Sequence, residues 1–120
     1  ISFVQTDYSL EQAYNLGDTI VSFNPSAVIC ATDNIALGLL RYFHEKKIHV
    51  PQDISLAGFG GYPVGSISYP SLTSLAFDYK HLGIKTVEKL LSMLQNQPVT
   101  SEYDHNMNLI IRESTRLAKI

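Results

Sequence analysis

Hydrophobic residues along the chain fall into short runs of strand length, separated by stretches with helical spacing. Strands are predicted at Ile1–Val4, Ala27–Ala31, Ile54–Ala57, Leu72–Phe77 and Met107–Ile111. The run Ala27–Ala31 contains no polar position, which is typical of a strand covered on both faces. The pattern therefore predicts a parallel sheet with helices on both sides.

Three helices are predicted between these strands. The first follows Ser9, which has the spacing of a capping box, and ends before Pro25. The second runs from Asn34 to about Lys47. The third is capped by Asp78 and is amphipathic. Its predicted inward positions are Ile84, Val87, Leu91 and Leu94.

The helix predicted at residues 34–47, which Thr32 or Asp33 can cap, carries more apolar surface than one sheet can cover. Its apolar side chains fill an arc of roughly 220°, whereas packing on a sheet requires little more than about 100°. The surplus requires a second partner, either a helix of a longer protein or, slightly favoured, a second subunit. The arc consists of Tyr42, Ile35, Leu39, Phe43, Ala36, Leu40 and Leu37.

A glycine-rich segment, the crest (Gly58–Tyr62), follows the central predicted strand. Its three glycines release the backbone from strand geometry. Ligands of open α/β sheets sit beyond the carboxyl ends of strands, so the crest is a candidate binding site. An ordinary strand-to-loop turn explains the same residues equally well.

Composition and motifs argue against several functions. With 120 residues and a net charge of −2, the chain is at most one domain and has no basic surface for nucleic acid. Pro63 breaks a dinucleotide fingerprint, and no Walker loop or nucleophile elbow is present. No catalytic residue, metal site or cofactor is predicted, so we expect a protein that is not an enzyme. The four histidines do not have the spacing of zinc ligands with one another or with Cys30. They are His44, His49, His81 and His105.

The only cysteine, Cys30, lies in an apolar run and cannot form an internal disulfide, which favours a reduced, cytoplasmic protein. No apolar run approaches the roughly 20 residues that cross a bilayer, so no membrane contact is predicted. Because the chain starts without methionine on the apolar run Ile1–Val4, we expect it to be a piece of a longer protein.

Aromatic and polar side chains are predicted at or just beyond strand ends, where they can converge on one cleft. Aromatic faces beside hydroxyls and a carboxylate suit a polyhydroxylated ring, whose C–H faces pack on aromatics and whose edges need hydrogen-bond partners. Roles in the core or at a helix start explain each residue singly just as well. The candidates are Tyr8, Thr32, Asp33, Tyr62, Phe77 and Tyr79.

Several segments resemble LacI/GalR-type bacterial transcriptional regulators. Residues 25–38 are similar to the family's P-T-A-hydrophobic-N-D-x-x-A-x-G motif, and residues 50–55, 58–59, 70–73 and 112–115 follow its later signatures in order and spacing. The resemblance implies that residues 1–120 are a single partial domain, the C-terminal portion of an effector-binding domain. The implied fold is α/β, a parallel-sheet, three-layer subdomain of the periplasmic-binding-protein-like (type I) fold, incomplete at its N-terminus.

In such proteins a small-molecule effector binds between two α/β subdomains, the sensor forms a homodimer, and a helix-turn-helix absent from this chain reads operator DNA. The resemblance places effector contacts on Tyr8, which stacks on the ligand, and on Thr32, Phe77 and Tyr79. It places dimer contacts on Leu37, Leu40, Arg41, Val64, Ile67 and Ser68.

Gly60 departs from the family pattern, because many members have an aspartate there that grips ligand hydroxyls. Without a carboxylate at this position, we expect either a bulkier disaccharide such as sucrose or trehalose, or an anionic sugar phosphate. The predicted function is the effector-binding and dimerising part of a cytoplasmic repressor of carbohydrate use. Two alternatives stay open: a periplasmic or lipid-anchored sugar-binding protein of a transporter, and a sugar-modifying enzyme.

Overall fold

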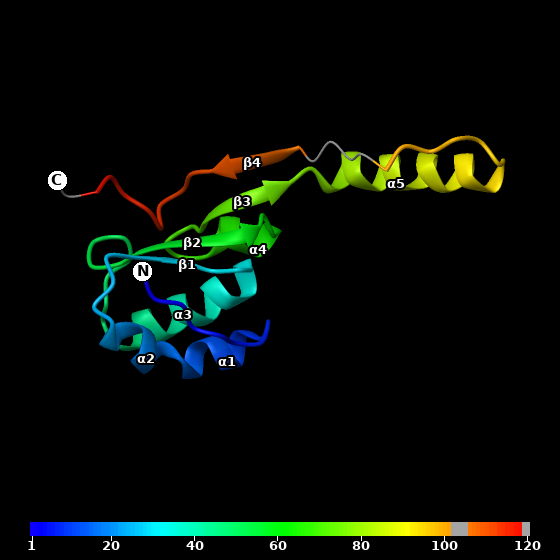
Figure 1. The fold of residues 1–120 in the computed structure, drawn as a ribbon. Coiled ribbons are helices and arrows are strands. Elements are labelled where there is room, and N and C mark those ends of the chain that lie inside the picture. The colour runs from blue at the N-terminus through cyan, green and yellow to red at the C-terminus, as the bar shows by residue number, and fades with distance from the viewer. Residues whose placement is uncertain (102–105, 119–120) are drawn as a thin grey trace.

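The computed structural model describes residues 1–101 and 106–118 and contains an open α/β sheet (Figure 1). Strands β1, β2 and β3 are parallel and adjacent in that order, and β4 pairs antiparallel with β3. This mainly parallel sheet confirms the predicted fold class. The elements are α1 (Leu10–Asn15), α2 (Gly17–Ser22), β1 (Ala27–Ile29), α3 (Asp33–Glu45), β2 (Ser55–Gly60), α4 (Pro63–Ile67), β3 (Thr73–Phe77), α5 (Tyr79–Leu94) and β4 (Met107–Ile110).

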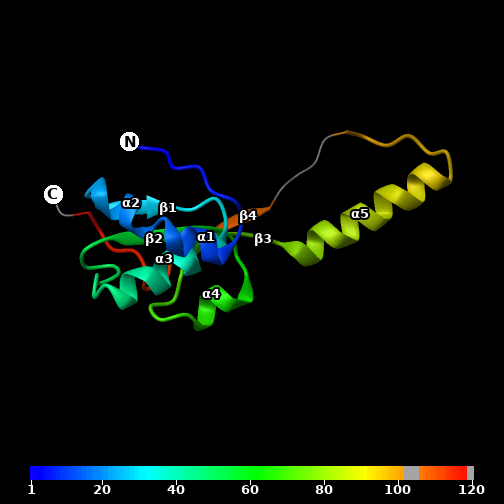
Figure 2. The same ribbon diagram turned by 90° about the horizontal axis from the view of Figure 1, so that it is seen from below.

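Helices α1, α2 and α3 lie on one face of the sheet, below it in Figure 1 and in front of it in Figure 2. The core forms between this face and the helices, where Phe43, Leu56 and Leu72 are fully buried. Helix α3 provides most of the remaining apolar core, and α1 contributes Ala13. Burial of these side chains supplies the main favourable free energy of folding.

Two glycines allow α1 and α2 to pack closely on α3. A Cβ atom at Gly38 would lie 2.2 Å from the Leu10 carbonyl oxygen, and one at Gly17 would lie 2.2 Å from the Tyr42 ring. The Tyr42 hydroxyl also donates a hydrogen bond to Asp18 at 2.5 Å, and this bond raises the pKa of Tyr42 to about 12.

The surplus apolar arc of α3 is therefore covered by this chain itself, and the inference that it needs an outside partner is wrong. The single predicted helix is instead two, α1 and α2, which meet at Leu16 and together wrap around α3. Leu40, predicted at the dimer interface, is only 7% exposed because it belongs to this core.

Within the described residues the outer face of the sheet is exposed, so this chain by itself provides two of the three expected layers, the sheet and the helices on one face. Ile29 is 86% exposed on β1, and by strand register Phe59, Leu75 and Leu109 share its face. The segment Ile1–Val4 is not a strand, because within the described residues it has no strand to pair with. In this chain the sheet is thus covered on one face.

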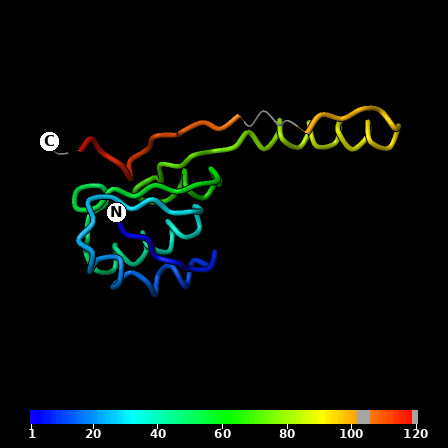
Figure 3. The backbone as a smooth tube through the Cα atoms, in the orientation of Figure 1, coloured from blue at the N-terminus to red at the C-terminus, as the bar shows by residue number. Residues whose placement is uncertain are grey.

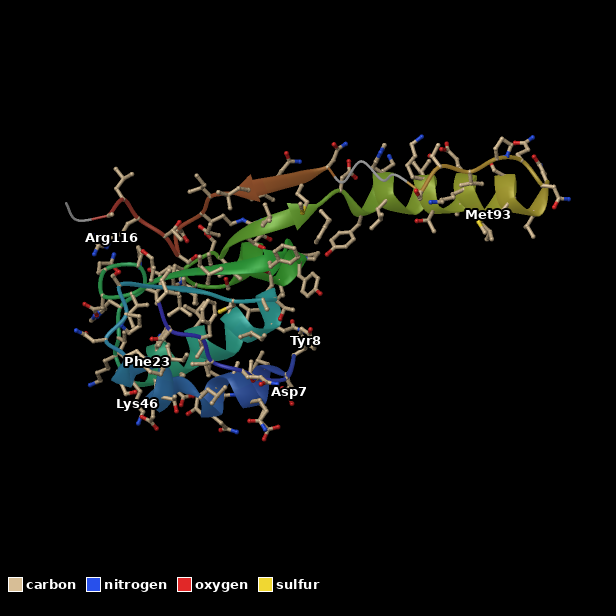
Figure 4. The ribbon with its side chains drawn as sticks, viewed as in Figure 1. Asp7, Tyr8, Phe23, Lys46, Met93 and Arg116 are labelled. Carbon is tan, nitrogen blue, oxygen red and sulfur yellow. The ribbon has the colours of Figure 1, made fainter. Side chains whose placement is uncertain are left out.

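Helix α5 projects from the end of β3, and it gives the molecule a length of 57 Å against 27 Å in the other two directions (Figure 3). None of its residues is buried, so the face predicted to point inward is exposed. Met93, labelled in Figure 4, lies on this projecting part. Among the described residues, no helix is both long and apolar enough to cross a membrane.

We predict opposite effects for alanine at two helical glycines. Gly38→Ala drives a Cβ into the backbone of α1 and should lower the free energy of unfolding of the intact protein by roughly 1–3 kcal/mol. Gly83→Ala on α5, where a Cβ meets no atom within 4 Å, should raise it by up to about 1 kcal/mol. Urea unfolding measures both, and equal effects would contradict the tight α1–α3 contact.

Candidate functional site

The carboxyl ends of β1, β2 and β3 lie together at one end of the sheet, where α3 and α5 begin (Figure 1). The predicted ligand-contacting residues follow these strand ends or lie close to them. Tyr8 lies at the same end of the molecule, beside the start of α3 (Figure 4). The predicted site residues are thus not scattered over the fold.

The carboxylate of Asp33 fixes the shape of the crest. Its Oδ2 accepts the backbone N–H of Tyr62 at 2.6 Å, and its Oδ1 accepts the Ser74 hydroxyl at 2.6 Å. The same hydroxyl oxygen of Ser74 accepts the backbone N–H of Gly61 at 3.0 Å. One buried side chain at the start of α3 therefore holds both the crest and β3.

Asp33 is 0% exposed, so it is not available to a ligand in this structure, and its assignment as an effector contact is corrected. Both carboxylate oxygens are already hydrogen-bonded within the chain. The neighbouring Thr32, half-buried, caps α3 by accepting the Ile35 N–H at 3.3 Å. Asp33 is thus a positioning residue behind the site.

The crest differs from the loose turn that three glycines predict. Gly58 lies inside β2, and the absence of a side chain there makes room for Asp33, because a Cβ would lie 2.2 Å from its Oδ1. Gly60 and Gly61 have φ values of +124° and +70°, a backbone region that favours glycine. Helix α4 begins at Pro63, directly after the crest, although no helix start was predicted there.

Phe59 of the crest forms an aromatic wall with Phe77 and Tyr79. The Phe59 and Phe77 rings meet edge to face with centroids 5.2 Å apart, and the Phe77 and Tyr79 rings are 5.9 Å apart. The Tyr79 hydroxyl donates to the Gly60 carbonyl at 2.8 Å, and desolvation raises the pKa of this tyrosine. The sequence analysis does not include Phe59 among the site residues. The alternation of side chains along β2 places Phe59 on the face of the sheet opposite the core.

Tyr8 borders a separate cavity of about 320 Å³ between the N-terminal segment, β1 and α3. Its side chain is 73% exposed, and the cavity is lined mainly by apolar groups such as Ile29 and Leu39. Cys30 also lines this cavity, and its burial raises the pKa of the thiol to about 12. A thiol with this pKa stays protonated near neutral pH and is a poor nucleophile.

The other predicted dimer residues lie on α3 and α4. Val64 and Ile67 are exposed on α4, whereas Leu37 is half-buried. The Ser68 hydroxyl donates to backbone carbonyls within its own turn. Arg41 pairs with Glu45 at 3.1 Å on the surface of α3. An apolar exposed patch on α4 therefore remains available, while Leu40 does not.

A second cavity of about 510 Å³ lies at the opposite, amino-terminal end of the strands, near His49, Pro51, Tyr69 and Glu113. It contains none of the predicted ligand-contacting residues.

Within residues 1–101 and 106–118, no cluster of three or more potential metal-ligating side chains occurs. His105 lies outside the described residues.

An open α/β sheet that gathers aromatic side chains at its parallel strand ends has the arrangement of a small-molecule-binding domain. The chain matches the family described as periplasmic binding protein-like domain over residues 2–115, and it belongs to that family. Its relatives are LacI-family transcriptional regulators, which confirms the resemblance seen in the motifs.

The ribose operon repressor of Halalkalibacterium halodurans is 25% identical over 116 residues, which cover 94% of this chain and 35% of that protein. HTH-type transcriptional regulator MalR of Streptomyces coelicolor is 30% identical over 112 residues, or 92% of this chain and 33% of that protein. The lac repressor dimer bound to operator and the anti-inducer ONPF matches with a TM-score of 0.83 at 29% identity, covering 91% of this chain and 39% of that chain. The chain spans about a third of the length of these curated relatives.

We predict that Asp33→Asn lowers the free energy of unfolding of the intact protein by roughly 2–4 kcal/mol, because an amide cannot replace a carboxylate that accepts two hydrogen bonds in a buried site. Asp7→Asn is the matched control, because the Asp7 carboxylate also accepts two hydrogen bonds, from the backbone N–H and the hydroxyl of Ser9, but lies exposed on the surface. Chemical denaturation should give a clearly smaller loss for the control. Equal losses would show that the crest does not depend on Asp33.

Proposed function

We propose that this chain is the effector-binding and dimerising part of a transcription repressor that controls carbohydrate use. The observation that carries the proposal is the aromatic wall beside the crest, at the strand ends where open α/β sheets bind ligands. Membership of the periplasmic binding protein-like family and the likeness to sugar-operon repressors support it.

The proposed effector is a sugar or a sugar phosphate. Aromatic rings pack on the C–H faces of sugars, and the hydroxyl groups of Tyr62 and Tyr79 beside the crest can hydrogen-bond their edges. Residues proposed to face the effector are Tyr8, Thr32, Gly60, Tyr62, Phe77 and Tyr79. Position 60 offers no carboxylate to the ligand, and the proposal includes a disaccharide such as sucrose or trehalose.

The remaining parts of the site and of the DNA-binding apparatus are proposed to come from the rest of a longer protein. An exposed apolar sheet face around Ile29 and the unburied helix α5 are surfaces that another α/β subdomain would cover. A helix-turn-helix outside this chain would contact operator DNA, and the protein would work in the cytoplasm.

Regulation would follow from differential affinity. The two subdomains can be arranged at different angles to each other. If the effector binds one of these conformations more tightly than the other, it shifts the population of the dimer that can bind DNA. The start of α5 at Tyr79 lies directly against the crest through its bond to Gly60, so effector contact and the orientation of α5 are physically linked.

We predict that Tyr8→Ala weakens effector binding to the intact protein at least about tenfold, because one stacking face is lost. Calorimetric titration with sucrose, trehalose and their phosphates measures this, and Tyr69→Ala is the matched control. Tyr69 is also an exposed tyrosine, but it precedes β3 at the opposite end of the strands. Tight binding only of a nucleobase or an amine would contradict the proposed function.

A second prediction concerns the dimer. Ile67→Asp places a charge on the exposed apolar patch of α4 and should raise the dimer dissociation constant at least about tenfold. Phe23→Asp, at an exposed position after α2, should leave the dimer intact. Sedimentation velocity of the intact protein distinguishes the two, and an Ile67→Asp variant as dimeric as the control would exclude α4 from the interface.

A further inference from the structure

Gly60 and Tyr62 share one space at the crest. A Cβ atom at Gly60 would lie 2.9 Å from Tyr62 Cε1, closer than real Cβ contacts come. Gly60 also has φ of +124°, where a side chain is strained whatever the space. The Tyr62 ring therefore fills the place that a side chain at position 60 would need.

The position of Tyr62 is fixed from both ends of the crest. Its backbone N–H donates to the buried Asp33 carboxylate, and its carbonyl accepts the Gly65 N–H in the first turn of α4. Gly61, between the two residues, donates its N–H to Ser74 and lies so close to Ala76 that a Cβ would be 2.3 Å away. The backbone of Tyr62 is thus fixed on both sides, and in this structure its ring lies beside Gly60.

The crest and the aromatic wall together offer ring faces and neutral hydroxyls. The carboxylate behind them, that of Asp33, is fully buried and already hydrogen-bonded. Cations in ring contacts lie elsewhere, with Arg41 on Tyr14 and Lys46 on Tyr42. Within the described residues, the hydrogen bonds of Gly60, Gly61 and Tyr62 involve no lysine or arginine.

We propose that Tyr62 is a specificity-determining residue of the effector site, and that its ring takes the place of a side chain at position 60 and selects a neutral saccharide. The inference rests on the proposed function and narrows it. A neutral saccharide presents C–H faces to aromatic rings without requiring a charged partner, whereas a phosphate or an amine requires one.

Calorimetric titration of the intact regulator with trehalose, sucrose and trehalose 6-phosphate tests the ring directly. Tyr62→Ala should weaken binding of the neutral disaccharide at least about tenfold, whereas Tyr62→Phe, which keeps the ring, should change it by less than about threefold. Unchanged affinity in Tyr62→Ala, with wild-type binding intact, would overturn the inference and leave the proposed function standing. Binding of the phosphate alone would do the same.

A double-mutant cycle tests the shared space without any ligand. Gly60→Ala should lower the melting temperature of the intact regulator by about 4 °C or more. In a Tyr62→Ala background the same substitution should cost clearly less, because only the backbone strain remains. An equal loss in both backgrounds would overturn the steric part of the inference. Absence of binding by every sugar in the wild-type protein would instead overturn the proposed function itself.

Discussion

The burial of one carboxylate organises this end of the molecule. Asp33 begins α3, but its oxygens reach the crest and, through Ser74, strand β3. A buried carboxylate is costly in free energy unless it is hydrogen-bonded. The start of α3, the crest and β3 therefore pack in the arrangement in which these bonds form. These bonds position the crest, and the Tyr79 hydroxyl joins the start of α5 to it. The Asp33 carboxylate can therefore shape the site without contacting a ligand.

Local rules in the sequence predicted most of the elements. Thr32 and Asp78 cap their helices as expected, because an N-cap depends on a few neighbouring residues. The strand runs were placed correctly except at the N-terminal segment, and the convergence of site residues followed from parallel strands sharing one end. Short-range chemistry of this kind can be read from one sequence.

Features that depend on packing could not be predicted. The sequence does not show that the absence of a side chain at Gly38 lets α1 pack against α3. The apolar arc of α3 is therefore predicted to need a partner outside the chain. Asp33 was interpreted as a ligand contact because its partners, Ser74 and Tyr62, are 41 and 29 residues away. Helix α5 forms as predicted, but the face predicted to point inward is exposed, because an apolar pattern does not say whether the surface that covers it belongs to the same stretch of chain.

The central claim is that residues of this chain form one wall of a saccharide site at the carboxyl ends of the parallel strands. A crystal structure of the intact regulator grown with trehalose or sucrose tests it most directly. The account predicts sugar atoms in contact with the rings of Tyr62, Phe77 and Tyr79. A sugar bound in the cavity near His49 and Tyr69, at the other end of the strands, would contradict it.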